Sequence, residues 1–169
     1  MLVTRILLAV VFIPMLVEAR IAAVNERALL RRGGLEAAGD VYRVMRVAYP
    51  AVFFLMIAEG AFWPGHELFT IGLAIFVAAK LLKSWAIWTL GDAWTFRVVT
   101  VPGKRRVTGG PYRWLRHPNY VGVAGELVGV ALMSGARVTG PIGAILFGLL
   151  MRKRISVEER ALDASARSI

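Results

Sequence analysis

Five apolar blocks alternate with arginine-rich segments along this chain of 169 residues, and this alternation constrains the fold more than any other feature. The blocks are residues 2–24, 47–63, 68–90, 120–133 and 138–151. A helix that spans a bilayer needs roughly 20 apolar residues, and the first three blocks approach that length. The last two are shorter and are separated by Ser134, Gly135, Ala136 and Arg137, so we expect a tight helical hairpin there. The pattern predicts an all-α polytopic membrane protein with about five transmembrane helices.

The basic residues gather in alternate segments of the chain. They lie between the first and second blocks, between the third and fourth, and after the last. Residues 61–69 contain no lysine or arginine, and Arg137 stands alone in the last hairpin. Because positive charge stays on the cytoplasmic side of a membrane, we expect the N-terminus outside and both basic loops and the C-terminus in the cytoplasm.

The composition excludes several classes of protein. Apolar residues make up 57% of the chain, too many for a soluble basic domain, so the net charge of +10 indicates contact with lipid headgroups rather than with nucleic acid. The chain has no cysteine and only two histidines, His66 and His117. Disulfides, a cysteine nucleophile and a thiolate or histidine-rich metal site are therefore excluded, and we expect no metal.

Two short helices are expected outside the apolar blocks. Residues 25–40 read as an amphipathic helix in the membrane interface that ends at Gly33 and Gly34. Residues 152–162 read as a cytoplasmic helix that follows the last span.

The segment GGPYRWLRHPNYVG, residues 109–122, has the features of a shaped turn rather than of a linker. Pro111 and Pro118 fix their own φ angles and restrict the residues before them to extended conformations. His117 and Tyr120 then lie where the next helix begins. The free N–H groups of such a helix end favour a carboxylate or another anion.

Five charged residues in or near the apolar blocks need an explanation. Arg154 and Glu158 are four residues apart and share one helix face, where they form either a surface ion pair or a site for the anionic group of an amphiphile. Glu126 lies within an apolar block. Burying a carboxylate there costs free energy, which indicates a pocket or a partner for it. Lys80 and Lys83 raise the same question, although their stems can snorkel toward the cytoplasmic surface.

Residues 82–122, then Glu126, then the stretch RISVEERAL resemble the isoprenylcysteine carboxyl methyltransferase family, integral membrane enzymes that use S-adenosyl-L-methionine. The resemblance covers about half of the chain. Together with the apolar blocks it indicates one membrane domain over residues 1–169, with three spans in 1–90 and a cofactor-binding loop, the hairpin and a C-terminal helix in 91–169. It implies a cofactor site lined by Lys104, Val107, Tyr112, His117, Pro118, Asn119, Tyr120 and Glu158. Arg154 and Glu158 are then the candidate catalytic residues, and Arg154 and Glu126 the candidates for binding the methyl acceptor.

The acceptor is expected to be a small lipophilic molecule that enters from the bilayer. A carboxylate acceptor is already ionised and needs only an anchor such as Arg154, whereas a phenol or pyrone needs a base, for which Glu158 and His117 are available. Two other functions stay open. Membrane reductases of the sterol type use NADPH and have a similar RHxNY element, and a small membrane protein can also bind lipid without catalysis.

Overall fold

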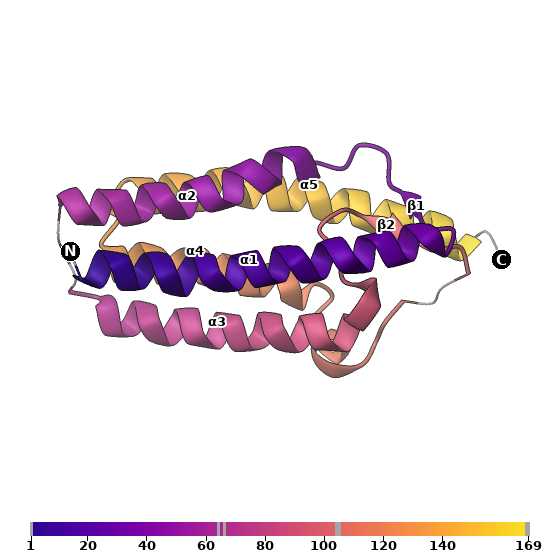
Figure 1. Ribbon diagram of the computed structural model, residues 1–169, viewed down its shortest axis with the longest axis horizontal. Helices are drawn as coiled ribbons and strands as arrows, with labels where there is room; N and C mark the ends of the chain where they lie inside the picture. Colours follow the sequence, from indigo (N-terminus) through magenta and orange to yellow (C-terminus); the bar gives the residue numbers. More distant parts are fainter. Residues whose placement is uncertain (1, 64, 66, 104–105, 168–169) are drawn as a thin grey trace.

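The computed structural model describes residues 2–63, 65, 67–103 and 106–167. Within these residues, long α-helices lie side by side along one axis (Figure 1). They are α1 (Leu2–Arg31), α2 (Tyr42–Phe62), α3 (Phe69–Leu90), α4 (Pro118–Ser134) and α5 (Thr139–Arg167). The remaining elements are the short 3-10 helices η1 (Gly91–Ala93) and η2 (Gly110–Arg113) and the strands β1 (Leu35–Glu36) and β2 (Val99–Thr100). The predicted all-α class is confirmed.

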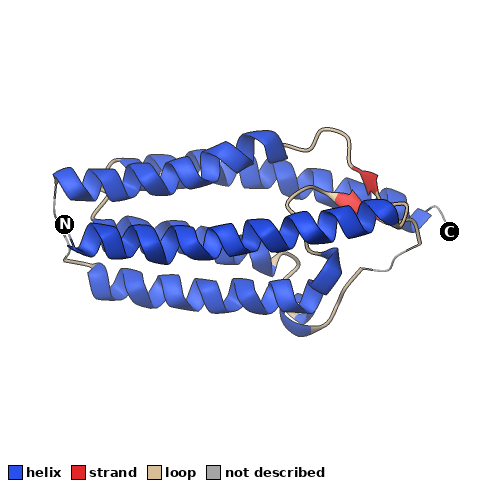
Figure 2. Ribbon diagram, in the orientation of Figure 1, coloured by secondary structure: helices blue, strands red, loops and turns tan. Residues whose placement is uncertain are grey.

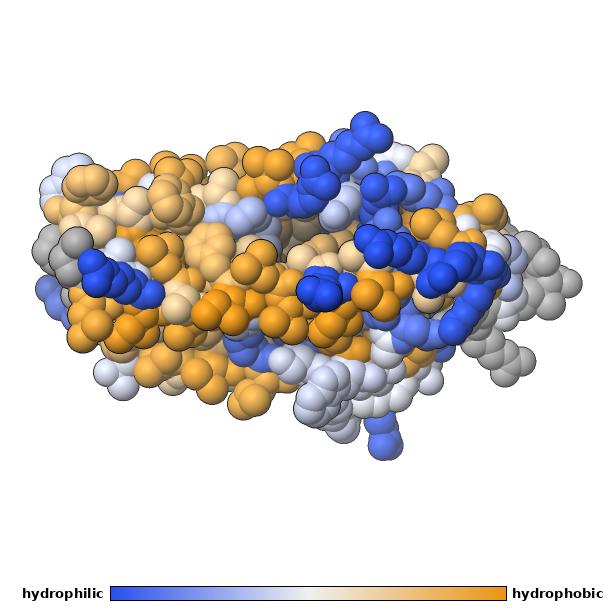
Figure 3. Space-filling view, in the orientation of Figure 1, coloured by the Kyte–Doolittle hydropathy of each residue, from blue (hydrophilic) through white to orange (hydrophobic). Residues whose placement is uncertain are grey.

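The two strands form a small ribbon at one end of the bundle, as Figure 2 shows. They pair antiparallel, with Leu35 opposite Thr100 and Glu36 opposite Val99. This pairing ties the α1–α2 loop to the long loop between α3 and α4. In Figure 3 the hydrophilic side chains gather at this end, and apolar side chains cover most of the rest of the visible surface.

Three helical stretches are long and apolar enough to cross a membrane: Leu2–Arg31, Tyr42–Phe62 and Phe69–Ala93. The fourth and fifth spans stay a prediction, because α4 has only 17 residues and α5 combines an apolar first half with a charged second half. Gly135, whose φ of +71° is a left-handed conformation, ends α4, and α5 begins only four residues later. The last two apolar blocks thus form the expected hairpin.

Two boundaries differ from those expected. The amphipathic helix predicted for residues 25–40 is wrong as a separate element: α1 continues unbroken to Arg31, and β1 follows. No glycine or proline interrupts residues 24–32, so the helix ends only at Gly33, whose φ is +82°. The helix expected at 152–162 is likewise not separate but is the second half of α5.

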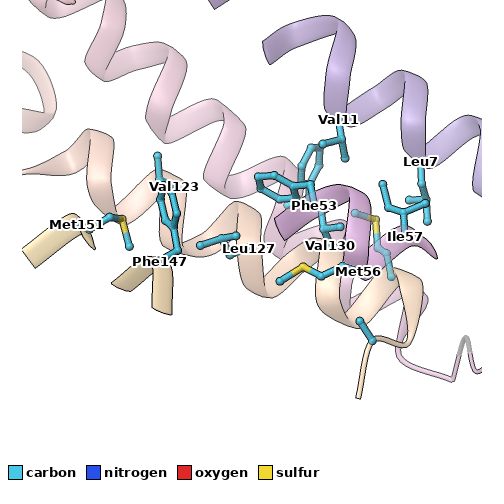
Figure 4. Packing of buried hydrophobic residues seen from close by; sticks show 13 residues of the cluster. Leu7, Val11, Phe53, Met56, Ile57, Val123, Leu127, Val130, Phe147 and Met151 are labelled. Atoms are coloured by element: carbon cyan, nitrogen blue, oxygen red, sulfur yellow. The ribbon is translucent and has the colours of Figure 1, made fainter. Parts of the chain in front are cut away.

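Glycine allows α3 and α4 to approach each other closely. A Cβ atom on Gly129 of α4 would lie 2.7 Å from the Cβ of Phe76, and one on Gly72 of α3 would lie 2.7 Å from the carbonyl oxygen of Gly129. Small residues at helix interfaces are typical of packing in membranes, where close contact replaces the hydrophobic effect. Around this contact the buried core combines Phe53, Met56, Leu127, Val130 and Phe147 with neighbouring apolar residues (Figure 4).

A cluster of four charged side chains lies inside the bundle. Lys83 contacts Glu18 at 2.6 Å and Glu126 at 3.3 Å, and Lys80 contacts each of the same two carboxylates at 3.0 Å. The hydroxyl group of Tyr49 donates a hydrogen bond to Glu126. The partner expected for Glu126 is therefore present, but the snorkelling considered for the lysines is wrong. Both turn inward, because the interior offers each of them two carboxylates.

The close approach of α3 and α4 yields a prediction about stability. We expect Gly129→Val to lower the free energy of unfolding by about 1–3 kcal/mol, since the added side chain forces the two helices apart. Gly148→Ala on α5 is the matched control, because a Cβ atom there meets nothing within 4 Å and alanine favours a helix. Thermal unfolding in lipid nanodiscs measures both. Equal midpoints for the two variants would contradict the packing argument.

Candidate active site

A cavity of about 430 Å³ lies where the helical bundle meets the loops of the polar end. It opens between α1 and α2, where Leu16 and Arg46 line it and are exposed; Figure 3 shows a hollow at this place. One part of its wall is mainly apolar and includes Phe12, Met15, Met45, Pro50 and Phe147. The other part is polar and includes Tyr112, His117, Asn119, Tyr120, Arg154 and Glu158. A molecule that fills the cavity therefore needs both an apolar and a polar portion.

A chain of hydrogen bonds crosses the polar part from α4 to α5. The Nε–H of Arg154 donates to the hydroxyl oxygen of Tyr120 at 2.9 Å, and that hydroxyl donates to Oε2 of Glu158 at 2.7 Å. Tyr120 lies in the first turn of α4, which Pro118 begins. Arg154 and Glu158 lie one turn apart on α5, so one face of that helix presents both charges to the tyrosine.

Asp40, in the loop before α2, holds the other side of Arg154. Its Oδ1 atom accepts from Nη1 of Arg154 at 2.8 Å and from the backbone N–H of Tyr42 at 3.0 Å. Its Oδ2 atom accepts from the backbone N–H of Val98 at 2.8 Å. The side chains of Arg154 and Asp40 are only 8% and 4% exposed, so this pair is largely removed from water.

A second contact joins the shaped turn to α5. Nε2 of His117 lies 3.2 Å from Oε1 of Glu159, and Nη2 of Arg116 lies 3.3 Å from the same oxygen. The hydrogen bond with His117 and the positive charge of Arg116 lower the pKa of the Glu159 carboxyl. Nearby, burial and the negative charge of Glu158 raise the pKa of Tyr112, so this phenol stays neutral at physiological pH.

Asn119 leaves an unsatisfied acceptor at the cavity. Its Oδ1 atom is buried and has no hydrogen-bond partner among the described residues. A buried carbonyl oxygen without a donor costs free energy, and such atoms in native proteins are commonly explained by a bound ligand or water. Because Asn119 also lines the cavity, a ligand with an N–H or O–H group fits this position.

Most of the site residues expected from the sequence come together here. Those that line the cavity are Val107, Tyr112, His117, Asn119, Tyr120, Arg154 and Glu158. Pro118 is buried at the start of α4, and Lys104 lies outside the described residues. Glu126 does not line the cavity but contacts Tyr49 and Lys83, which do.

The sequence analysis missed Asp40, which contacts Arg154. It also missed three aromatic side chains that line the cavity: Tyr42, Trp94 and Phe96. Asp40 stands just before an apolar helix, a position that indicates helix capping and no contact with a distant arginine. Trp94 and Phe96 follow the third apolar block, where aromatic residues usually indicate the membrane interface.

Comparison with known proteins identifies relatives. The model of the isoprenylcysteine carboxyl methyltransferase (ICMT) family matches residues 71–164. The chain is 28% identical to the uncharacterised protein YpbQ of Bacillus subtilis, over 94% of this chain and 95% of the relative. An uncharacterised protein of Haemophilus influenzae is 27% identical over 82% of this chain and 83% of its own length.

A named enzyme also matches the chain. The protein-S-isoprenylcysteine O-methyltransferase of Tribolium castaneum is 29% identical over 72% of this chain. The match covers 44% of that enzyme, so this chain corresponds to less than half of its length. No solved structure matches the chain.

The His117–Glu159 contact predicts a pH-dependent difference in stability. Because its pKa is lowered in the folded state, Glu159 stabilises the fold above its unfolded value of 4.5, and this stabilisation is lost as the pH falls through the folded value. We expect Glu159→Gln to have a lower thermal midpoint than the parent at pH 7 and the same midpoint once the pH lies well below 4.5.

Glu67→Gln is the control for this measurement. Its side chain is 84% exposed and lies 3.9 Å from Arg137, so we expect little change at either pH. A difference between Glu159→Gln and the parent that persists at the lower pH would contradict the assignment.

Proposed function

The chain belongs to the isoprenylcysteine carboxyl methyltransferase family, and on that premise we propose that it is an S-adenosylmethionine-dependent O-methyltransferase for a lipophilic acceptor. The observation that carries the proposal is the hydrogen-bonded chain Arg154–Tyr120–Glu158 in the wall of a cavity with one apolar part and one polar part. Methyl transfer needs an electrophile and an oxygen nucleophile aligned in a site that excludes water. This cavity has suitable groups for both reactants.

The residues of the polar part fit the methyl donor. S-adenosylmethionine supplies a methyl group activated by a positively charged sulfur, and it also has N–H and hydroxyl donors. Glu158 would offer a negative charge to the sulfonium, and Oδ1 of Asn119 would accept from one of the donors. Tyr112 and His117 complete this wall. Since Tyr112 stays neutral, it acts as a hydrogen-bonding and packing surface and adds no charge.

The apolar part fits the tail of the acceptor. The opening lies between α1 and α2, two helices that are apolar enough to cross a membrane, so a membrane-dissolved acceptor can enter from the bilayer. Its reactive oxygen then reaches Arg154, which orients a carboxylate or stabilises an ionising phenol or pyrone hydroxyl. The arginine-rich loops at this polar end favour a position on the cytoplasmic side, where S-adenosylmethionine is made.

The identity of the cofactor can be tested directly. For the protein in lipid nanodiscs, we expect S-adenosylmethionine and S-adenosylhomocysteine to raise the thermal midpoint, because each binds only the folded state. NADPH is the control that represents a membrane reductase. Stabilisation by NADPH but by neither adenosyl compound would replace the methyltransferase with the reductase, and no stabilisation by any of them would favour a lipid-binding protein without catalysis.

The roles of Arg154 and Glu158 are separated by their effects on binding and turnover. We expect Arg154→Gln to lower methyl transfer from labelled S-adenosylmethionine to lipid extracts roughly tenfold to a hundredfold without weakening cofactor binding, since hydrogen bonds to charged groups contribute about 1.5–3 kcal/mol. Glu158→Gln should weaken cofactor binding itself. Arg137→Gln, at the exposed opposite end of the bundle, is the control. Loss of cofactor binding in Arg154→Gln would remove Arg154 from the acceptor side of the site.

A further inference from the structure

Asp40 brings a second carboxylate to the polar end of the cavity. It lies outside residues 71–164, which match the family model, and Gly39, with a φ of +78°, precedes it. Through Arg154 and Tyr120 it is connected to Glu158 by an unbroken series of contacts. The guanidinium of Arg154 therefore lies between two carboxylates. When both are ionised, Asp40, Arg154 and Glu158 together carry one net negative charge.

Four other arginines line the same cavity: Arg46, Arg97, Arg106 and Arg116. Arg116 contacts Glu159, and Arg97 contacts Glu26 and Glu36, so these two arginines have carboxylate partners of their own. Asp40 itself accepts three N–H donors, an arrangement that a carboxylate satisfies. Since its side chain is only 4% exposed, water screens its charge weakly.

We propose that Asp40 sets the charge of the cofactor site, so that the site prefers the cationic methyl donor to the neutral thioether that remains after transfer. This inference rests on the proposed function. With Asp40 ionised, the charge of Arg154 is balanced and the carboxylate of Glu158 remains available to a sulfonium. Methyl transfer removes the positive charge from the sulfur, and the attraction to the site is lost at that moment. Asp40 thereby favours donor binding and product release by one and the same charge.

Asp40 also has a positioning effect on Arg154. Nε and Nη1 of Arg154 are occupied by Tyr120 and Asp40, whereas Nη2 has no hydrogen-bond partner among the described residues. Arg154 lines the cavity, so the edge of the guanidinium that carries Nη2 is the one left for the acceptor. Asp40 thus acts through Arg154 and is not itself a lining residue.

The inference can be tested without a turnover assay, by comparing how tightly the protein binds the methyl donor and the product. Dissociation constants of S-adenosylmethionine and S-adenosylhomocysteine are measured by calorimetry on the full chain in nanodiscs. In Asp40→Asn, we expect the preference for S-adenosylmethionine to fall roughly fivefold to thirtyfold. This is the effect of the interaction energy between two unit charges several ångströms apart in a partly screened site. A residue that only supports the fold would weaken both ligands equally and leave their ratio unchanged.

Two further variants test the measurement from both sides. Asp163→Asn makes the same chemical change at an exposed position on α5 and should leave the ratio unchanged. Arg154→Met removes the positive member of the group and should raise the preference for S-adenosylmethionine. This opposite sign keeps the inference testable even if Asp40→Asn fails to fold.

The outcomes separate the two proposals. An unchanged ratio in Asp40→Asn, or a lowered one in Arg154→Met, overturns the role of Asp40 and leaves the methyltransferase proposal standing. A parent chain that binds neither adenosyl compound contradicts the proposed function, and the inference falls with it.

Discussion

The paired charges of Glu18, Lys80, Lys83 and Glu126 are the constraint on which the rest of the bundle depends. In an apolar interior, an unpaired charge costs far more than a missing van der Waals contact, so these four side chains have to meet. They belong to α1, α3 and α4, and Tyr49 brings α2 into the same cluster. The packing of four helices is thereby specified by a polar contact, while the glycines of α3 and α4 allow the approach that brings Lys83 and Glu126 to 3.3 Å.

The cavity follows from this arrangement. Tyr49 and Lys83 belong both to this cluster and to the cavity wall, so the cluster fixes the inner boundary of the cavity. The outer boundary is made by loops, and their positions depend on Asp40 and on the ribbon of β1 and β2. An ionic cluster among the helices and hydrogen bonds among the loops thus define the two ends of the cavity.

The local patterns of the sequence predict much of the fold and part of the site. Apolar blocks locate the helices, prolines identify the shaped turn, and a spacing of four residues places Arg154 and Glu158 on one face. What the sequence does not reveal are pairings between distant positions. Asp40 and Arg154 are separated by 114 residues, and Lys83 and Glu18 by 65, so no local periodicity links them. The interfacial helix expected at residues 25–40 was wrong for a related reason: a change from apolar to charged composition does not end a helix where no glycine or proline stands at the change.

The continuity of α5 has a consequence for the chemistry. Phe147 belongs to the apolar part of the cavity wall, and Arg154 belongs to the polar part, seven residues later on the same helix. At 1.5 Å per residue, the two side chains begin about 10 Å apart along the axis. A helix broken at the membrane surface would let this distance vary, whereas an unbroken helix holds Phe147 and Arg154 in one rigid frame. Under the proposed function, an acceptor whose tail packs against Phe147 would present its polar end at a fixed height beside Arg154, so the secondary structure would supply the proximity that methyl transfer needs.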